Sequence, residues 1–244
     1  MRAIEASFEL GLKIVNKIKE TQFENIEEAS QLIAKAHENG CTFFVSGSGH
    51  SHSVSEELYG RAGSLAFTVP IITDELTLTS HPTKSSYIEN LSGYAEILGK
   101  LYKISEGDVI LIASNSGRNN YPVELACYAK KCGAKVIALT SLNHSRNTEP
   151  RNSINKRLYE ISDVVIDNCG EKGDAGLQIV NVSGKVNPTS SIANSFICGA
   201  LSSRIVEILA EDGYDNETFV SANVDGGFEQ NAALMDKYCR MYYK

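Results

Sequence analysis

The stretch that decides the fold is DVILIASNSGRNNYPVELACYAKKCGAKVIALT, which covers residues 108–140. It starts with an apolar run typical of a buried strand, turns at a serine–glycine cluster, and continues as a helix with Pro122 near its first turn and Gly133 at its end. A second apolar run, KVIALT, again has the composition of a strand. Strand, helix and strand in this order predict a βαβ unit, in which both strands lie parallel in one sheet.

The same alternation continues on both sides of this unit. Strand-like runs occur at CTFFVSG (residues 41–47), LAFTVPII (65–72) and DVVID (163–167). Apolar residues spaced three and four apart predict helices in the first forty residues, over 86–103 and over 190–210. We therefore predict an α/β fold whose parallel sheet carries helices on both faces.

The order of these segments predicts one domain with two helical extensions. Residues 1–40 form a helical N-terminal lead that packs on the domain, residues 41–212 form the domain itself, and residues 213–244 form a helical C-terminal arm. With 244 residues the chain is long enough to bury a substantial core.

Composition and charge narrow the classes of partner. The formal net charge is −7, whereas a protein that binds the phosphate backbone of nucleic acid needs a basic face, so we expect no nucleic-acid partner. No apolar run is long enough to span a membrane, and charges throughout the first twenty residues predict a helix of the mature protein and not a signal peptide. The six cysteines form no CxxC motif, which favours a reduced, cytoplasmic chain.

Glycine–serine turns follow two of the predicted strands, and both turns are rich in neutral hydrogen-bond donors. Loops at the carboxyl ends of parallel strands form the binding crevice of open α/β sheets. Hydroxyl groups, side-chain amides and backbone N–H groups at two helix N-termini can together bind one tetrahedral anion, although each hydrogen bond contributes only about 1 kcal/mol. The candidate anion-binding residues are Ser48, Ser51, Ser114, Asn115, Ser116 and Asn119.

Three other interpretations of the first turn, GSGHSHS (residues 47–53), fit its residues less well. A dinucleotide-binding GxGxxG motif requires glycine where His52 stands, and a nucleophile elbow around Ser51 requires glycine in place of Ser53. A zinc site normally requires three or four ligands, whereas this turn supplies only His50 and His52. We therefore predict neither a metal nor a cofactor.

The segments FFVSGSGHS (residues 43–51) and 108–140 resemble the two signature segments of the sugar isomerase (SIS) domain family, and the resemblance extends from Phe43 to about Leu209. It implies a flavodoxin-like, three-layer α/β/α sandwich that binds phosphosugars, usually as a dimer or tetramer with sites near subunit boundaries. The whole chain most resembles a branch of SIS proteins that carries only the general domain label, which gives a fold and a ligand class but no reaction.

The resemblance also implies roles for individual residues. In phosphoheptose isomerases and in the isomerase domain of glucosamine-6-phosphate synthase, a Ser-x-Ser-Gly loop holds the phosphate; it corresponds here to residues 114–119, with Asn119 in place of a hydroxyl residue. Ser51 matches the serine of the first turn. The segment EELYGRAG (residues 56–63) is similar to a segment of phosphoheptose isomerases whose second glutamate transfers protons, which corresponds to Glu57.

These roles imply aldose–ketose isomerisation of a sugar phosphate through an enediol, with Glu57 as the base and His52 or His81 as the ring-opening partner. Two positions depart from the family pattern. Ser53 replaces a histidine, and SANVDGG (residues 221–227) lacks the histidine of the arabinose-5-phosphate isomerases. The missing histidine favours the alternative of a non-catalytic phosphosugar sensor, and a lyase or etherase acting on an amino-sugar phosphate is a further alternative.

Arg118 adds a full positive charge beside the second turn, at a position that is commonly Asn or Glu in the family. A guanidinium offers a planar fork of donors that suits a carboxylate, a sulfonate or a second phosphate. We therefore expect a ligand that is more acidic than a simple neutral sugar phosphate.

The helix predicted over 190–210 has apolar residues on several faces. A helix of this kind is buried all round, either by the core or by a partner subunit. Together with the family resemblance, this pattern predicts a homodimer or homotetramer.

Overall fold

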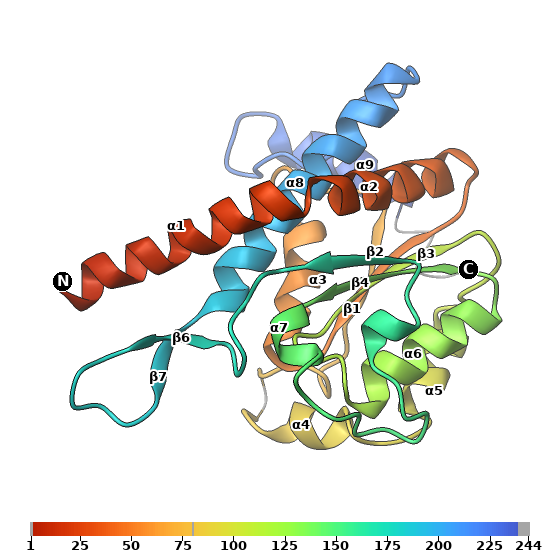
Figure 1. Cartoon of the computed structure of the whole chain (residues 1–244). Helices are drawn as coiled ribbons and strands as arrows, with labels where there is room; N and C mark the ends of the chain where they lie inside the picture. Colours follow the sequence, from red (N-terminus) through yellow and green to blue (C-terminus); the bar gives the residue numbers. More distant parts are fainter. Residues whose placement is uncertain (1, 80, 239–244) are drawn as a thin grey trace.

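The computed structural model describes residues 2–79 and 81–238. At its centre lies a five-stranded sheet with the strand order β2-β1-β3-β4-β5, in which neighbouring strands are parallel (Figure 1). The stretch 108–140 supplies β3, α6 and β4, so the predicted βαβ unit is confirmed. The strands of this sheet are β1 Phe43–Gly47, β2 Thr68–Ile71, β3 Val109–Ala113, β4 Lys135–Thr140 and β5 Val164–Asp167.

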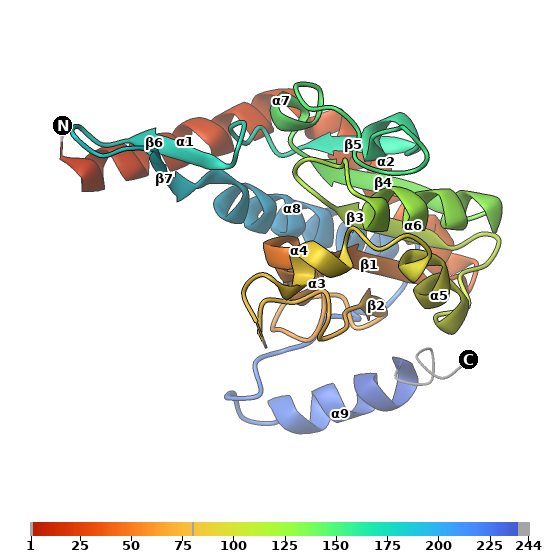
Figure 2. The ribbon, with the colours of Figure 1, turned by 90° about the horizontal axis from the view of Figure 1, so that it is seen from below.

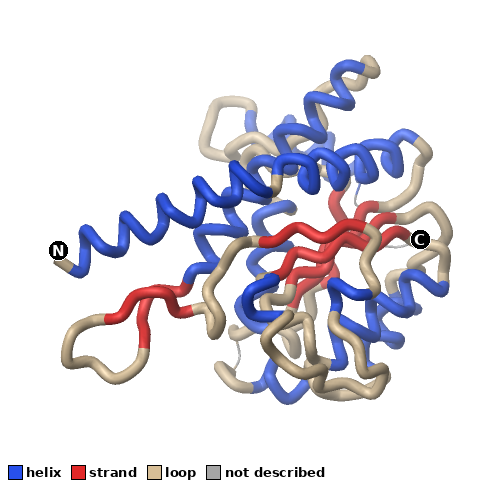
Figure 3. Tube along the Cα trace, in the orientation of Figure 1, coloured by secondary structure: helices blue, strands red, loops and turns tan. Residues whose placement is uncertain are grey.

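Helices cover both faces of the sheet, which confirms the predicted three-layer α/β/α sandwich (Figure 3). On one face α1, α2, α3 and α8 share a core with the strands, and on the other face α5 and α6 do so. The helices are α1 Ala3–Thr21, α2 Phe23–Glu38, α3 Ser53–Leu58, α4 Lys84–Ile88, α5 Tyr94–Leu101, α6 Asn120–Lys131, α7 Leu142–Ser145, α8 Thr189–Glu211 and α9 Gly227–Tyr238, with 3-10 turns at Gly49–His52 and Leu158–Glu160.

The residues of β3 show why these segments form buried strands. Val109 and Leu111 belong to the core beneath α1, α2 and α8, whereas Ile110 and Ile112 belong to the core beneath α5 and α6. A continuous apolar run is the pattern expected of a parallel strand that is covered on both faces. Pro70 lies in β2, an edge strand, where proline is tolerated.

The strand order places a topological switch between β1 and β3. From β1 the chain first moves to β2 on one side and then returns to β3 on the other side. The chain leaves β1 toward one face of the sheet through α3 and leaves β3 toward the other face through α6. Open α/β sheets bind ligands in the crevice at such a point. The first turn (residues 47–53) and the second turn (residues 114–119) both lie there.

The N-terminal helices α1 and α2 pack along α8. By length and composition alone, α8 is apolar enough to cross a membrane, but half of its most apolar window is buried inside the fold, as in the core helix of a soluble protein. Beside α1 lies a hairpin of β6 (Ala175–Gln178) and β7 (Lys185–Pro188), which we did not predict (Figure 2). None of its strand residues is buried, and they lack the apolar alternation that marks a half-buried strand.

The single helix predicted over 86–103 is wrong, because the structure has two helices, α4 and α5, separated by residues 89–93. Gly93 has a φ of 85°, a left-handed conformation that glycine adopts without strain. The Glu124 carboxylate of α6 fixes this break by accepting hydrogen bonds from the Ser92 hydroxyl and from the Gly93 N–H, both at 2.7 Å. As a result, Glu89 lies just beyond the end of α4 and not inside a long helix.

The predicted C-terminal arm contains α9, which lies apart from the sheet (Figure 2). Glu217 attaches α9 to the domain, because its carboxylate pairs with Lys237 and lies 2.7 Å from Nε2 of His37 in α2. Residues 239–244 of the predicted arm lie outside the described residues.

Candidate functional site

The first turn folds back tightly at the end of β1. A Cβ at Gly47 would lie 2.4 Å from the carbonyl oxygen of Ser51, so only glycine allows the backbone to approach this closely. Gly49 has a φ of 57°, and its N–H donates to the carbonyl oxygen of Leu76 at 2.8 Å. Ser48, which is almost buried, and Ser51, which is half-buried, are thereby held at the crevice.

The second turn is fixed by hydrogen bonds to the neighbouring strand and helix. The Thr140 hydroxyl at the end of β4 donates to the carbonyl oxygen of Ser114 at 2.7 Å, and the Ser145 hydroxyl of α7 donates to that of Ser116 at 2.7 Å. Within the turn, the Gly117 N–H donates to the Ser114 hydroxyl oxygen at 3.1 Å. The loop therefore has a defined shape before any ligand binds.

The two turns meet at one carboxylate, that of Glu89. The Ser48 hydroxyl of the first turn donates to Oε2 of Glu89 at 2.5 Å, and the Asn119 amide of the second turn donates to Oε1 at 2.6 Å. The sequence led us to expect that donors from both turns converge on one oxyanion. The structure does bring Ser48 and Asn119 together, but the oxyanion between them belongs to the protein itself.

Glu89 was not among the site residues predicted from the sequence. Burial raises the pKa of its carboxyl group, and the hydrogen bond from Ser48, the charge of Arg151 and the hydrogen bond from Asn119 oppose this only in part. A carboxyl group with a raised pKa can exchange a proton at milder pH than an exposed glutamate. The sequence feature that could have indicated Glu89 is Gly93. Its left-handed backbone is part of the break between α4 and α5, and because of this break Glu89 lies outside both helices.

Arg151 extends this network, and sequence reasoning missed it as well. Its Nε donates to Oδ1 of Asn119 at 2.9 Å, and its backbone N–H donates to the carbonyl oxygen of Arg118 at 2.8 Å. Asn119 thus accepts from Arg151 while it donates to Glu89. The amide orientation of Asn119 is fixed by these two partners, and the charge of Arg151 lies near the carboxylate.

Other donors of the two turns remain available to a ligand. Oδ1 of Asn115 accepts from Nδ2 of Asn168 at 2.8 Å, and Nδ2 of Asn168 also donates to Oδ1 of Asn194 in α8 at 3.0 Å. This leaves Nδ2 of Asn115 without a partner among the residues that the structure describes. The hydroxyls of Ser51 and Ser116, both half-buried, likewise have no partner in that part of the chain.

The structure places the predicted base, Glu57, on the α8 side of the sheet. Its carboxylate pairs with Arg61 one turn further along, and its side chain is 30% exposed. The helix that carries it, α3, packs against α8, where burial and the charge of Glu57 raise the pKa of the Cys198 thiol. In the described part of the chain, no hydrogen bond joins Glu57 to either turn.

In the described part of the chain, the ring nitrogens of the two candidate ring-opening histidines contact only their own segments. His52 has Nδ1 2.5 Å from the carbonyl oxygen of Gly49 and Nε2 3.4 Å from the Glu56 carboxylate, so both ring nitrogens have neighbours within its own segment. His81 is exposed, and its Nδ1 lies 3.1 Å from the Thr83 hydroxyl. Within residues 2–79 and 81–238, no three His, Cys, Asp or Glu side chains cluster so that they could hold a metal ion.

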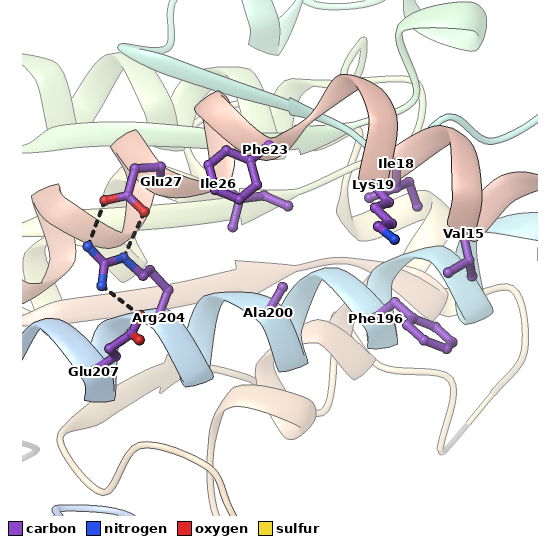
Figure 4. A pocket seen from close by; sticks show the side chains of 10 residues that line it. All are labelled: Val15, Ile18, Lys19, Phe23, Ile26, Glu27, Phe196, Ala200, Arg204 and Glu207. Atoms are coloured by element: carbon purple, nitrogen blue, oxygen red, sulfur yellow. Dashed lines mark hydrogen bonds and ion pairs between the residues drawn. The ribbon is translucent and has the colours of Figure 1, made fainter.

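A groove of about 770 Å³ lies between α1, α2 and α8, and none of its lining residues belongs to the two turns. Figure 4 shows Phe23 and Phe196 on opposite sides of this groove and Arg204 at one end. The Arg204 guanidinium donates to Glu27 and to Glu207, each at 2.7 Å. The groove is mainly apolar and its Arg204 is already paired. Lys19 is its other lining cation, so the groove offers a sugar phosphate fewer free donors than the two turns do.

Comparison of the whole chain with known proteins gives consistent matches. A family model described as "SIS domain" matches residues 8–141, which include both turns and Glu89. A UPF0309 protein of Halalkalibacterium halodurans is 41% identical over 228 residues, which cover 93% of this chain and 94% of that protein.

Solved structures share the fold at low identity. A phosphoheptose isomerase from Neisseria gonorrhoeae has a TM-score of 0.54 and 17% identity, and the match covers 85% of this chain and 97% of that one. The sugar isomerase domain of an RpiR transcription factor from Sphaerobacter thermophilus has a TM-score of 0.53 and 16% identity over 98% of this chain and 99% of that one. The resemblance that the sequence motifs indicated is confirmed by these matches.

Proposed function

Since the chain belongs to the SIS domain family and, within it, to the UPF0309 proteins, we propose that it binds a sugar phosphate in the crevice between β1 and β3 and interconverts the aldose and ketose forms of that sugar. The fold is a phosphosugar-binding fold whose solved neighbours include both isomerases and a regulator. The observation that carries the proposed reaction is the Glu89 carboxyl group, held between Ser48 and Asn119.

The phosphate would be bound by the donors that the protein does not already use. These are the hydroxyls of Ser51 and Ser116 and the Nδ2 of Asn115, with the hydroxyl hydrogen of Ser114 as a further donor. Each neutral hydrogen bond is weak, but bonds to a charged acceptor are stronger, and several of them act together.

The isomerisation requires a group that removes a proton from one carbon of the sugar and returns it to the adjacent carbon. Glu89 suits this role because burial raises its pKa, so that it can accept and release the proton under mild conditions. Glu57, the glutamate that the family resemblance implies, is the second candidate. It would first have to leave its ion pair with Arg61.

The test is a hydrogen-exchange experiment with a panel of aldose and ketose phosphates in D2O. Deuterium at the carbon next to the carbonyl reports proton abstraction, whichever isomer is favoured at equilibrium. We expect exchange with the wild-type protein and a loss of about 100-fold or more in Glu89→Gln, the scale of a positioned general base. Glu96→Gln is the matched control, because Glu96 is an exposed glutamate whose ion pair is with Lys100 at the surface.

The variants separate the two candidate bases. If Glu57→Gln loses exchange and Glu89→Gln keeps it, the role belongs to Glu57. If both variants exchange like the wild type, neither glutamate is the base. A loss in His52→Asn or His81→Asn that is confined to ring-closed substrates would identify the ring-opening residue.

A non-catalytic sensor is the second candidate function. It is favoured by the SIS fold of a transcription factor and by the absence of the family histidine from residues 221–227. For a sensor, the same panel would give tight binding without deuterium exchange on any sugar. Cleavage products instead of exchanged sugar would point to the lyase or etherase alternative.

We also propose that two chains associate through the face that carries the groove. Large exposed side chains gather there, among them Phe8 (70% exposed), Phe23 (69%) and Phe196 (56%). A monomer seldom exposes apolar side chains in such a concentration.

The five described cysteines are free thiols, which supports a cytoplasmic location.

A further inference from the structure

We propose that the crevice has a second anion subsite, formed by Arg118, His144 and Lys172, which binds another acidic group of the same sugar phosphate. This inference rests on the proposed function, since it concerns a further part of that ligand. The three residues follow β3, β4 and β5 along the chain. These strands are neighbours and parallel, so the loops after them lie at one edge of the sheet, the edge at which the second turn lies.

Arg118 is a half-buried cation without a counter-charge. Its backbone is held in place, because its carbonyl oxygen accepts from the Arg151 N–H and from Nδ2 of Asn152, both at 2.8 Å. Its Nε is buried without a hydrogen-bond partner, and no acceptor in residues 2–79 and 81–238 binds its guanidinium. By contrast, Arg61, Arg157 and Arg204 form ion pairs with glutamates.

His144 lies in α7, which the hydrogen bond from the Ser145 hydroxyl to the Ser116 carbonyl holds against the second turn, and it also has an unused nitrogen. Its Nδ1 is buried without a hydrogen-bond partner. Burial lowers the pKa of His144, and the charges of Arg118 and Lys172 lower it further, against the opposing charge of Asp174. His144 therefore lies within the field of two cations, and in the tautomer that carries a proton on Nδ1 the ring can donate one hydrogen bond to a ligand.

Asp174 does not neutralise this cluster, because its carboxylate is used elsewhere. Oδ1 accepts from the backbone N–H of Ser190 at 2.8 Å and from that of Thr189 at 3.1 Å, and Oδ2 accepts from the Ser190 hydroxyl at 2.9 Å. Asp174 thus holds the first turn of α8. Among the described residues, no carboxylate forms an ion pair with Arg118 or Lys172.

These observations define the chemistry of the missing partner. Two cations and two unpaired nitrogens call for an oxyanion, and a half-buried guanidinium binds a planar carboxylate through two parallel hydrogen bonds. The phosphate donors Asn115 and Ser116 lie two to three residues before Arg118 in the same turn. A sugar phosphate that also carries a carboxylate can therefore reach both subsites.

The experiment is calorimetric titration of the full chain with two probes, 6-phosphogluconate and glucose 6-phosphate, which differ at C1: the first carries a carboxylate on an open chain, and the second a ring-closing hemiacetal. We expect the wild type to bind 6-phosphogluconate at least tenfold more tightly. Arg118→Gln should lose roughly tenfold to a hundredfold in affinity for 6-phosphogluconate, the scale of a charge-assisted hydrogen bond, and change less than about twofold for glucose 6-phosphate. Arg118→Lys should lose part of the affinity, since it keeps the charge without the planar fork.

Arg146→Gln is the matched control, because Arg146 is an exposed arginine near His144 that lies over the Tyr159 ring. It should bind both probes like the wild type.

Equal losses for both probes in Arg118→Gln would assign Arg118 to the phosphate and overturn the second subsite, while the proposed function would stand. If the wild type bound neither probe, the proposed function would fail and this inference with it. Tighter binding of fructose 1,6-bisphosphate than of 6-phosphogluconate would contradict the preference for a carboxylate.

Discussion

At the scale of single residues, Glu89 is the centre of the candidate site. Its carboxyl group accepts one hydrogen bond from each turn, and Arg151 steadies Asn119 from the other side. Ser48 and Asn119 were predicted from the sequence to face one anion, because both follow buried parallel strands. Glu89 and Arg151 were not, since their positions depend on how distant segments pack and not on a local pattern.

The raised pKa of Glu89 has a consequence for stability. Because the folded chain binds this proton more tightly than the unfolded chain does, the contribution of Glu89 to the free energy of unfolding is full below the ordinary glutamate pKa. It is lost as the pH rises through the raised pKa of the folded state. We expect wild type to lose stability relative to Glu89→Gln as the pH rises from about 4.5, the ordinary glutamate value, through the raised pKa of the folded state.

Denaturant titration of both proteins across this range measures the effect, and all other titrating groups cancel in the difference. Glu96→Gln provides the control, because its exposed glutamate has a pKa that the partner Lys100 lowers. The difference in the free energy of unfolding between wild type and Glu96→Gln should change in the opposite direction with pH or not change at all. A difference for Glu89→Gln that does not depend on pH would contradict the pKa argument.

At the scale of elements, local patterns predicted the β3–α6–β4 unit well because every signal in it is local. A buried run, a turn, a proline near the helix start and a glycine at its end all act within a few residues. The break between α4 and α5 was missed because Ile88, Leu91 and Tyr94 keep a helical spacing across it. The break depends on the left-handed Gly93 and on Glu124, which reaches it from α6.

Substitution of two glycines by alanine should therefore change stability in opposite directions. Gly93→Ala places a Cβ on a left-handed residue, and although no atom lies within 4 Å of that Cβ, the backbone strain should lower the free energy of unfolding by roughly 1–2 kcal/mol. Gly199→Ala, in the exposed surface of α8 and also without an atom within 4 Å, should raise it by about 1 kcal/mol.

Thermal or denaturant unfolding at one protein concentration compares the two variants. Gly93→Ala should also lower the deuterium exchange rate, because the break positions Glu89. Unchanged stability in Gly93→Ala would show that residues 89–93 can adopt another backbone path.

At the scale of the whole molecule, two faces carry different chemistry. The crevice gathers polar groups from the loops after β1 and β3, together with Glu89 and Arg151, whereas the groove between α1, α2 and α8 is apolar. The sequence predicted only part of this separation between a polar crevice and an apolar groove. The apolar composition of residues 190–210 predicted a helix with a second covered face, but not which helices border the groove.

If two chains associate through the groove, a charge on its surface should separate them. Phe196→Glu should shift the mass in solution from two chains to one, as measured by light scattering after size-exclusion chromatography. Leu101→Glu is the control, because Leu101 is 69% exposed on α5, on the other side of the sheet. A monomeric wild type would contradict the association, and binding of the wild type to lipid vesicles would point to a membrane surface as the occupant instead.

One helix belongs to both faces. α8 carries Phe196 at the groove, and two residues earlier it carries Asn194, whose amide is linked through Asn168 to Asn115 in the second turn. A rotation of α8 that suits a partner would also move Asn194 and strain this amide chain. The apparent dissociation constant for the sugar phosphate would then depend on the protein concentration. Dilution that separates the two chains would by itself weaken binding of the sugar phosphate.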